Sequence, residues 1–208
     1  MTSGYQVVLD ACVLVNAALR DTLLRLAEPP HLYLPRWSED IIFEMVRTLE
    51  TKLNVTPAQT AHLVHEIELH FLDAWVEDYG PLISAMTNHP KDRHVLAAAV
   101  RTGAQTIITF NLKDFPETAL TPWNVEAQSP DDFLIHQYHL DPDMVVQKLY
   151  EQAERRGGIE RLLEIHHRAV PAFVSLIRKT DSVTAHSIMC VDKQAKNKGA
   201  SCGRFLCK

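Results

Sequence analysis

The sequence has no long hydrophobic run and no surplus of positive charge. None of its apolar stretches approaches the roughly 18 residues of a membrane span, so we expect no contact with a membrane. No basic, signal-like segment precedes the apolar run Val7–Leu9, and we therefore expect a cytoplasmic protein. The net charge is −5, whereas nucleic-acid binders often have a basic balance. An acidic metal site would itself carry several of these negative charges and present positive charge only once loaded.

Cysteine is also scarce, with four residues in 208. Cys12 lies in an apolar run and is predicted to be a small core residue. Cys190, Cys202 and Cys207 have spacings that match no CxxC zinc pattern, and a disulfide framework is not expected in a reducing compartment. A cysteine-based metal centre or a disulfide scaffold is therefore not predicted.

Short apolar runs alternate with helical patterns through the first 135 residues. Strands are expected at Tyr5–Leu9, Leu32–Leu34, Thr106–Thr109 and from Val125. Helices are expected over Ala11–Ala27, after an N-cap at Ser38, from Pro57 to about Phe71, and over Asp92–Arg101 with Gly103 as its C-terminal cap. The stretch Ala74–Ser84 is ambiguous. This alternation predicts an α/β fold with a parallel sheet covered on both faces.

The second half of the chain has a different pattern. Residues 142–179 look helical throughout, with a break at Gly157-Gly158 and a kink at Pro171, and His166-His167 is expected at the surface. We predict three parts: an α/β domain over 1–135, a small C-terminal helical appendage over 142–179, and a poorly ordered tail over 180–208.

Four acidic residues are placed to meet at one edge of the predicted sheet. Asp10 follows the first strand, Asp114 follows the strand Thr106–Thr109, and Asp92 begins a short helix. Glu44 lies one turn inside its helix. Clustered carboxylates raise one another's pKa, and hard cations such as Mg²⁺ or Mn²⁺ compensate for them. Such a site favours phosphoester chemistry, with all four acids as candidate catalytic residues.

Each of these acids also has a simpler explanation. Asp10 and Asp92 would serve as helix N-caps, Glu44 would be a solvated helix residue, and Asp114 would form a turn. The joint placement at one sheet edge favours the metal site over four separate structural roles.

Four segments resemble the motifs of PIN-domain proteins, especially the VapC-type toxins. They are Val7–Val15, Ser38–Glu44, Asp92–Ala99 and Thr109–Phe115, in the family's order and spacing, within roughly residues 5–135. The resemblance implies a PIN-like α/β/α sandwich with a central parallel sheet and a Mg²⁺ or Mn²⁺ site. It also implies an endoribonuclease that acts as the toxin of a type II toxin–antitoxin pair, with a small antitoxin as its partner.

The chain departs from the family in the fourth motif. There the family often has Asp two residues after the Thr, whereas this chain has Asn111 after Thr109. An Asn oxygen can coordinate a cation but brings no charge, so Asn111 and Asp114 both stay candidates for the fourth metal ligand. RNA phosphates would be contacted by Arg93, Lys113 and Arg36, together with Thr109, and such contacts make binding dependent on salt.

Two other functions fit part of the sequence pattern. A phosphohydrolase of the haloacid-dehalogenase type needs a second Asp two residues after Asp10, and Cys12 occupies that position. A non-catalytic RNA-binding or interaction protein on a PIN-like fold stays as the alternative, supported by Asn111 and the acidic net charge. Region 142–179 could serve a homodimer or dock the antitoxin, and the sequence does not separate the two.

Overall fold

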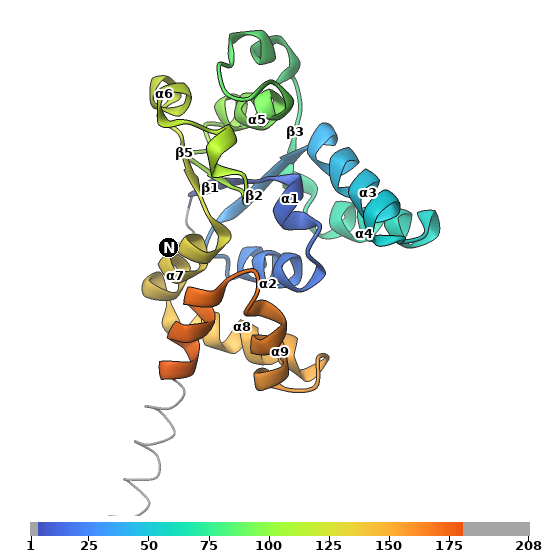
Figure 1. Cartoon of the computed structure of the whole chain (residues 1–208), viewed down its shortest axis with the longest axis vertical. Coiled ribbons are helices and arrows are strands. Elements are labelled where there is room, and N and C mark those ends of the chain that lie inside the picture. Colours follow the sequence, from blue (N-terminus) through green and yellow to red (C-terminus); the bar gives the residue numbers. More distant parts are fainter. Residues whose placement is uncertain (1–3, 181–208) are drawn as a thin grey trace, which may run out of the picture.

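A five-stranded parallel sheet crosses the centre of the computed structural model, which describes residues 4–180 (Figure 1). Its order is β3-β2-β1-β4-β5, and every neighbouring pair is parallel. The strands are β1 (Gln6–Leu9), β2 (Leu34–Ser38), β3 (Trp75–Val76), β4 (Thr106–Ile108) and β5 (Glu126–Gln128). The predicted α/β fold with a central parallel sheet is confirmed.

Helices cover both faces of this sheet, with α5 on one side and α2 on the other (Figure 1). The helices are α1 (Ala11–Leu14), α2 (Ala17–Ala27), α3 (Glu39–Leu53), α4 (Pro57–His70), α5 (Arg93–Thr102), α6 (Glu117–Leu120), α7 (Pro130–Leu140), α8 (Pro142–Glu154), α9 (Ile159–His166) and a last helix over 171–180. Short 3₁₀ turns are η1 (Leu72–Ala74), η2 (Gly80–Ala85), η3 (Pro90–Asp92), η4 (Leu112–Asp114) and η5 (Thr121–Trp123). Because the sheet is covered on both faces, Val7, Val8 and Leu9 of β1 are all fully buried.

The second strand lies farther along the chain than the sequence predicts. β2 begins at Leu34, where the expected strand ends, and it includes Pro35. Leu34 donates its N–H to the Tyr5 carbonyl (2.8 Å), so the next backbone nitrogen, that of Pro35, faces the β3 side. β3 pairs only with Trp37 and Ser38, and the proline therefore removes no ladder hydrogen bond.

The expected helix over Ala11–Ala27 is two helices. The Asn16 side chain accepts hydrogen bonds from the N–H groups of Ala18 (3.2 Å) and Leu19 (3.1 Å), which starts α2 as a new helix. The predicted cap at Ser38 is confirmed by its bond from the Ile41 N–H (3.3 Å), and Gly103 ends α5 at a φ of 69°. The ambiguous stretch Ala74–Ser84 holds β3 and most of η2.

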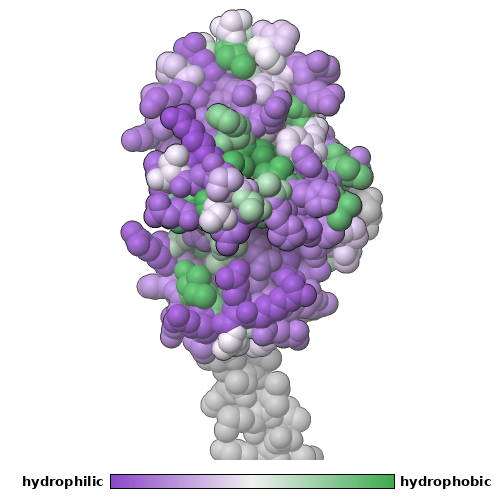
Figure 2. All heavy atoms as spheres, turned by 90° about the vertical axis from the view of Figure 1, so that its right-hand side faces the viewer, coloured by the Kyte–Doolittle hydropathy of each residue, from purple (hydrophilic) through white to green (hydrophobic). Residues whose placement is uncertain are grey.

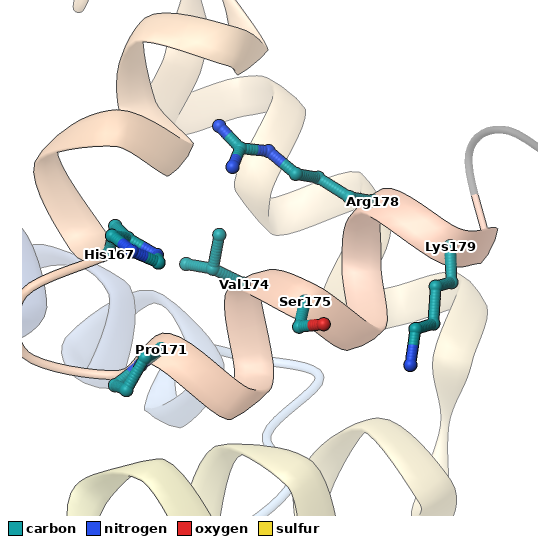
Figure 3. A pocket seen from close by; sticks show the side chains of 6 residues that line it. All are labelled: His167, Pro171, Val174, Ser175, Arg178 and Lys179. Carbon is teal, nitrogen blue, oxygen red and sulfur yellow. The ribbon is translucent and has the colours of Figure 1, made fainter.

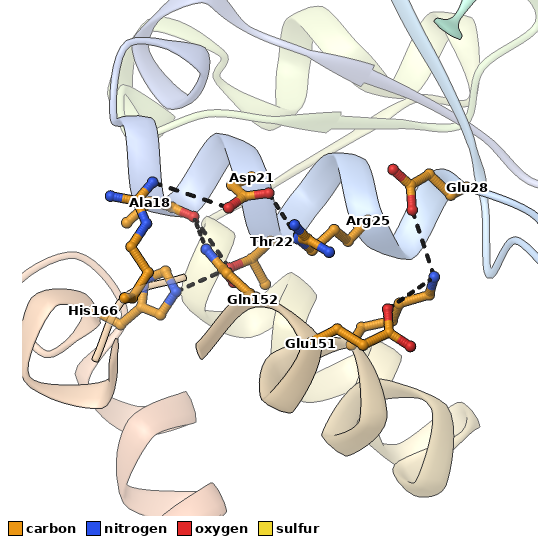
Figure 4. Close-up of polar contacts among 10 residues, drawn as sticks. Ala18, Asp21, Thr22, Arg25, Glu28, Glu151, Gln152 and His166 are labelled. Carbon is orange, nitrogen blue, oxygen red and sulfur yellow. Dashed lines mark hydrogen bonds and ion pairs between the residues drawn. The ribbon is translucent and has the colours of Figure 1, made fainter. Parts of the chain in front are cut away.

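The C-terminal helices pack on α2 through a buried chain of polar side chains (Figure 4). His166 Nε2 lies 2.9 Å from the Thr22 hydroxyl, which donates to Gln152 Oε1 (2.7 Å), and Gln152 Nε2 donates to the Ala18 carbonyl (2.9 Å). His166 is 1% exposed, so the prediction that it lies at the surface is wrong; His167 is exposed. The second nitrogen of His166, Nδ1, is buried without a hydrogen-bond partner.

Two further features of the helical region differ from expectation. It begins with α7 at Pro130, and Pro171 starts a new helix after a turn instead of kinking a continuous one. The predicted break is confirmed, because Gly157 and Gly158 separate α8 from α9 at φ values of 86° and 99°. Leu149, Leu162 and Phe173 of this region belong to the same core cluster as β1.

Some expectations fall beyond the described part of the chain. The predicted tail from residue 181 onward, with Cys190, Cys202 and Cys207, lies outside the described residues. Within residues 4–180, no helix has both the length and the apolar character to cross a membrane. The division of the chain into domains stays a prediction.

Candidate metal centre

Asp10 stands between β1 and α1, and its side chain does not cap the helix. The residue is 2% exposed, and its backbone N–H donates to the Ile108 carbonyl of β4 (3.1 Å). Its Oδ2 atom accepts hydrogen bonds from the Thr109 hydroxyl (2.6 Å) and the Cys12 thiol (3.1 Å). The helix-cap explanation of Asp10 therefore lacks its hydrogen bond, and the carboxylate is held by Thr109, which follows β4, and by Cys12 of α1.

Asp92 likewise directly precedes a helix, α5, without capping it. It occupies the N-cap position without a side-chain cap bond. Its Oδ2 atom lies 3.2 Å from His89 Nδ1. Burial raises the pKa of Asp92, and the charges of Asp10 and Asp114 raise it further, while His89 acts in the opposite direction.

Glu44 joins this group from α3. Burial raises its pKa, and so do the charges of Asp10 and Asp92. His94 lowers the pKa of Glu44, and its Nε2 atom lies 3.8 Å from Glu44 Oε2. The structure thus brings Asp10 close enough to Glu44 and Asp92 for its charge to raise the pKa of both.

Asp114 lies close to Asp92 and His89. Single ligand atoms of His89, Asp92 and Asp114 all lie within 4.8 Å of one another, which is a spacing that can hold a metal ion. Backbone bonds fix the loops, since His89 N–H donates to the Asp114 carbonyl (3.0 Å) and Asp114 N–H to the Asn111 carbonyl (2.8 Å). The half-buried Asn111 donates its own N–H to the Thr109 hydroxyl oxygen (3.0 Å).

Comparison with known proteins gives an independent finding. This chain is 57% identical over 67 residues to a protein of Mycobacterium tuberculosis described as "Putative ribonuclease VapC50". The match covers 32% of this chain, and the chain spans about two fifths of that relative's length. The predicted resemblance to VapC-type PIN-domain proteins is confirmed, and the five-stranded parallel sheet is consistent with the PIN fold. No protein-family model matches the chain, and no solved structure matches it.

Two residues of this site are not among the candidates from the sequence. His89 lies three residues before Asp92 and turns back toward it. Cys12 was predicted to be a core residue, yet it is partly exposed and its sulfur also accepts the Phe110 N–H (3.2 Å). Burial and the nearby Asp10 charge raise the pKa of Cys12 to about 12, so the thiol stays a neutral hydrogen-bond donor to Asp10. The position of Cys12, two residues after Asp10, is the sequence signal that could have placed it at the site.

Three of the four predicted phosphate-binding residues lie beside the acids, and the fourth does not. Arg93 is half-buried beside Asp92 and donates from Nε to the Asn88 carbonyl (3.3 Å), and Lys113 is exposed beside Asp114. Thr109 contacts Asp10 directly. Arg36 is not brought to the acids, because its guanidinium bonds Gln6 Oε1 (2.6 Å) and the Asp73 carbonyl, beside the start of β1.

The donor set fits a divalent cation. Among the described groups that act most strongly on the pKa values of Glu44 and Asp92, the only basic side chains are histidines, and none is a lysine or arginine. His94 is nine-tenths buried, and its Nε2 atom, which faces Glu44, has no hydrogen-bond partner. The carboxylate charge is therefore left without a fixed protein cation, and a bound metal ion would balance it.

A hollow elsewhere in the chain does not share this chemistry. It has a volume of about 290 Å³ and lies between the end of α9 and the last helix (Figure 3). Its lining residues are His167, Pro171, Val174, Ser175, Arg178 and Lys179. None of them carries a carboxylate, so this hollow is not a candidate for the cation.

Proposed function

We propose that this chain is a metal-dependent endoribonuclease that cleaves RNA phosphodiester bonds. The carrying observation is the group of acids at the carboxyl edge of the sheet, where burial and the nearby carboxylate charges raise the pKa values of Glu44 and Asp92. In open α/β sheets, ligands bind at this edge. The 67-residue similarity to a VapC protein supports the same chemistry.

The acids Asp10, Glu44, Asp92 and Asp114 would hold Mg²⁺ or Mn²⁺. When bound, such an ion polarises a phosphate and lowers the pKa of a bound water. Thr109 and Cys12 orient Asp10 through hydrogen bonds of 2.6 and 3.1 Å to the same oxygen, which leaves Oδ1 for a ligand. Arg93 and Lys113 flank the acids and would bind the RNA phosphates on either side.

For the fourth ligand we favour Asp114 over Asn111. The Asp114 charge acts on the pKa of Asp92, and its carboxylate lies within 4.8 Å of the Asp92 and His89 ligand atoms. Asn111 contributes through its backbone, which ties the loop to Thr109. A carboxylate three residues later would thereby replace the charge that the family often has at position 111.

The deciding experiment is cleavage of single-stranded or loop RNA by the purified chain with Mn²⁺ or Mg²⁺, stopped by EDTA. Asp10→Asn and Asp92→Asn should reduce cleavage more than about 100-fold, beyond the effect of groups that only support a ligand. Asp78→Asn is the matched control, because Asp78 is exposed and pairs with Arg101 (3.5 Å). Undiminished cleavage by Asp92→Asn would refute the assignment.

The alternative function, RNA binding without cleavage, predicts a different result. The wild-type chain would then retain RNA in a binding assay and leave it intact with either metal. Asn111→Asp would restore cleavage if the missing charge is the reason for the loss.

We further propose that the chain is the toxin of a type II pair and that a small antitoxin docks on the face formed by α3, α4 and β3. This face has an apolar groove of about 660 Å³ lined by Ile42, Phe43, Val46 and Trp75, with Glu39 and Glu68 at its edge. Phe43 is 63% exposed, next in sequence to Glu44, and Figure 2 shows hydrophobic side chains gathered at mid-height on this side of the molecule. A basic amphipathic segment would complement both the apolar lining and the acidic rim.

This partner is tested by pull-down from native cells. Phe43→Asp should lose a small basic protein that wild type retains, while Leu140→Asp, at an exposed position of α7, should keep it. Recovery of no small partner by wild type would contradict the toxin role. A chain that is dimeric in solution and becomes monomeric with Leu140→Asp would instead assign the C-terminal helices to self-association.

A further inference from the structure

His89 brings a nitrogen ligand to the group of acids. It precedes η3, and its side-chain Nδ1 atom faces Asp92 Oδ2 at 3.2 Å. The same Nδ1 atom is 3.4 Å from the Lys91 N–H, which donates to it. Its backbone N–H holds the Asp114 carbonyl at 3.0 Å, so the histidine is fixed to both acids that it faces.

These contacts place an imidazole nitrogen opposite a carboxylate. In the tautomer in which Nδ1 accepts the Lys91 N–H, its lone pair also faces the Asp92 oxygen 3.2 Å away, and a cation held by both atoms would satisfy them together. The ligand atoms of His89, Asp92 and Asp114 all lie within 4.8 Å of one another, which leaves room for one ion that touches all three.

A second imidazole faces Glu44, the acid whose pKa is raised by the Asp10 and Asp92 charges. His94 is 9% exposed, and its Nε2 atom has no hydrogen-bond partner and lies 3.8 Å from Glu44 Oε2. Buried polar atoms normally have a partner, so an orphan nitrogen aimed at a carboxylate indicates a ligand in that space. This observation is independent of His89 and indicates that the group of acids binds a cation.

We propose that His89 Nδ1 is a direct ligand of the bound ion, and that it makes this centre favour Mn²⁺ over Mg²⁺. Mg²⁺ takes oxygen ligands almost exclusively, whereas first-row transition ions accept imidazole nitrogen. The inference rests on the proposed metal centre and adds a ligand type that the acidic motifs do not include.

The test measures metal binding, not activity. Mn²⁺ is titrated into the purified full chain and followed by electron paramagnetic resonance, and Mg²⁺ is measured by competition. Wild type should bind Mn²⁺ at least about tenfold more tightly than Mg²⁺ and show ¹⁴N modulation from a bound imidazole. His89→Asn should lose that modulation and about tenfold in Mn²⁺ affinity, while Mg²⁺ affinity changes less than about threefold.

The variants separate a ligand from a structural role. Asn at position 89 can still accept the Lys91 N–H, so η3 keeps its cap. His62→Asn is the matched control, because His62 Nδ1 also faces a carboxylate, that of Glu66 at 3.9 Å, on the exposed surface of α4. It should change neither the affinity nor the ¹⁴N signal.

The possible failures differ from one another. Mn²⁺ bound without ¹⁴N modulation, or equal losses for both metals in His89→Asn, overturns the nitrogen ligand and leaves the acidic centre intact. A wild-type chain that binds neither metal overturns the proposed function and this inference together. Loss of Mn²⁺ binding in Asp92→Asn, with ¹⁴N modulation in wild type, supports both.

Discussion

The Thr109 hydroxyl donates a hydrogen bond to Asp10 Oδ2 over 2.6 Å, which joins the carboxyl ends of the adjacent strands β4 and β1. Thr109 is fully buried, and its oxygen also accepts the Asn111 N–H (3.0 Å). The hydroxyl therefore fixes the orientation of a candidate ligand and the start of the loop that carries Asp114.

Replacing this hydroxyl should weaken the metal site without unfolding the chain. Thr109→Val keeps the shape of the side chain but removes the donor to Asp10, and we expect a loss of about 10- to 100-fold in metal affinity and RNA cleavage. Thr109→Ser should retain most of both. Metal titration by calorimetry and a cleavage assay measure the effect.

Thr106→Val is the matched control at the other end of β4. Thr106 is equally buried, but its hydroxyl bonds Tyr5 (2.6 Å) and Glu126 (3.2 Å), away from the acids. An equal loss of metal affinity in Thr106→Val would show that damage to the strand, not to Asp10, explains the Thr109 result.

The metal-free chain should become more stable when one acid loses its charge. The pKa values of Asp92 and Glu44 are raised above the ordinary 3.8 and 4.5, so the folded chain holds these protons at a pH where the unfolded chain has lost them. Metal-free stability therefore falls as pH rises through this window. We expect Asp92→Asn to raise the melting temperature measured in EDTA near pH 7 and to flatten its fall with pH.

The same variant should lose the stabilisation that Mn²⁺ gives to wild type, because a ligand that binds only the folded state stabilises it. The exposed-site variant Asp78→Asn serves as control and should behave as wild type in EDTA and in Mn²⁺. A lower melting temperature of Asp92→Asn in EDTA would contradict a net destabilising effect of the buried Asp92 charge.

Much of this site could be predicted from the sequence, because its signals are local. Asp10 directly follows an apolar strand, and Asp92 directly precedes an amphipathic helix, so each acid is placed by the end of its own element. The parallel sheet then brings these ends to one edge. Only the geometry shows that neither carboxylate is used as a cap.

The residues that lie elsewhere than expected depend on contacts between distant segments. Arg36 looks well placed in sequence, but its guanidinium turns toward Gln6 of the neighbouring strand. His166 has the polar pattern of a surface residue, yet Thr22, 144 positions earlier in the chain, provides a buried partner. Side-chain direction and long-range pairing of this kind have no periodic signature in a single sequence.

The two candidates for the fourth ligand can be separated by charge. Asp114→Asn should lower metal affinity at least about tenfold, because it removes a carboxylate that acts on Asp92. Asn111→Asp should raise metal affinity if position 111 reaches the ion, and leave it unchanged if Asn111 acts only through its backbone. Calorimetric titration of both variants and of the double variant measures this, and full affinity of Asp114→Asn would transfer the assignment to Asn111.

The buried His166 should make the packing of the C-terminal helices on α2 sensitive to acid. Burial and the nearby Arg156 lower the pKa of His166 from 6.5 to about 4, with Asp21 acting in the opposite direction. In the neutral form, Nε2–H can donate to Thr22, whereas protonation would add an N–H at Nδ1, which is buried without a partner. Between pH 6.5 and about 4, His166 therefore binds a proton in the unfolded chain but not in the folded chain.

Stability should accordingly fall as pH drops from about 6.5 to about 4, by on the order of 3 kcal/mol from this histidine. His166→Gln retains a donor toward Thr22 but cannot be protonated. We expect it to be less stable than wild type at pH 7, where the amide fits the site less well, and to lose less stability between pH 7 and 4.5. Chemical denaturation at several pH values measures this difference, with the exposed neighbour variant His167→Gln as control. Equal pH slopes for His166→Gln and wild type would show that His166 does not carry the acid sensitivity.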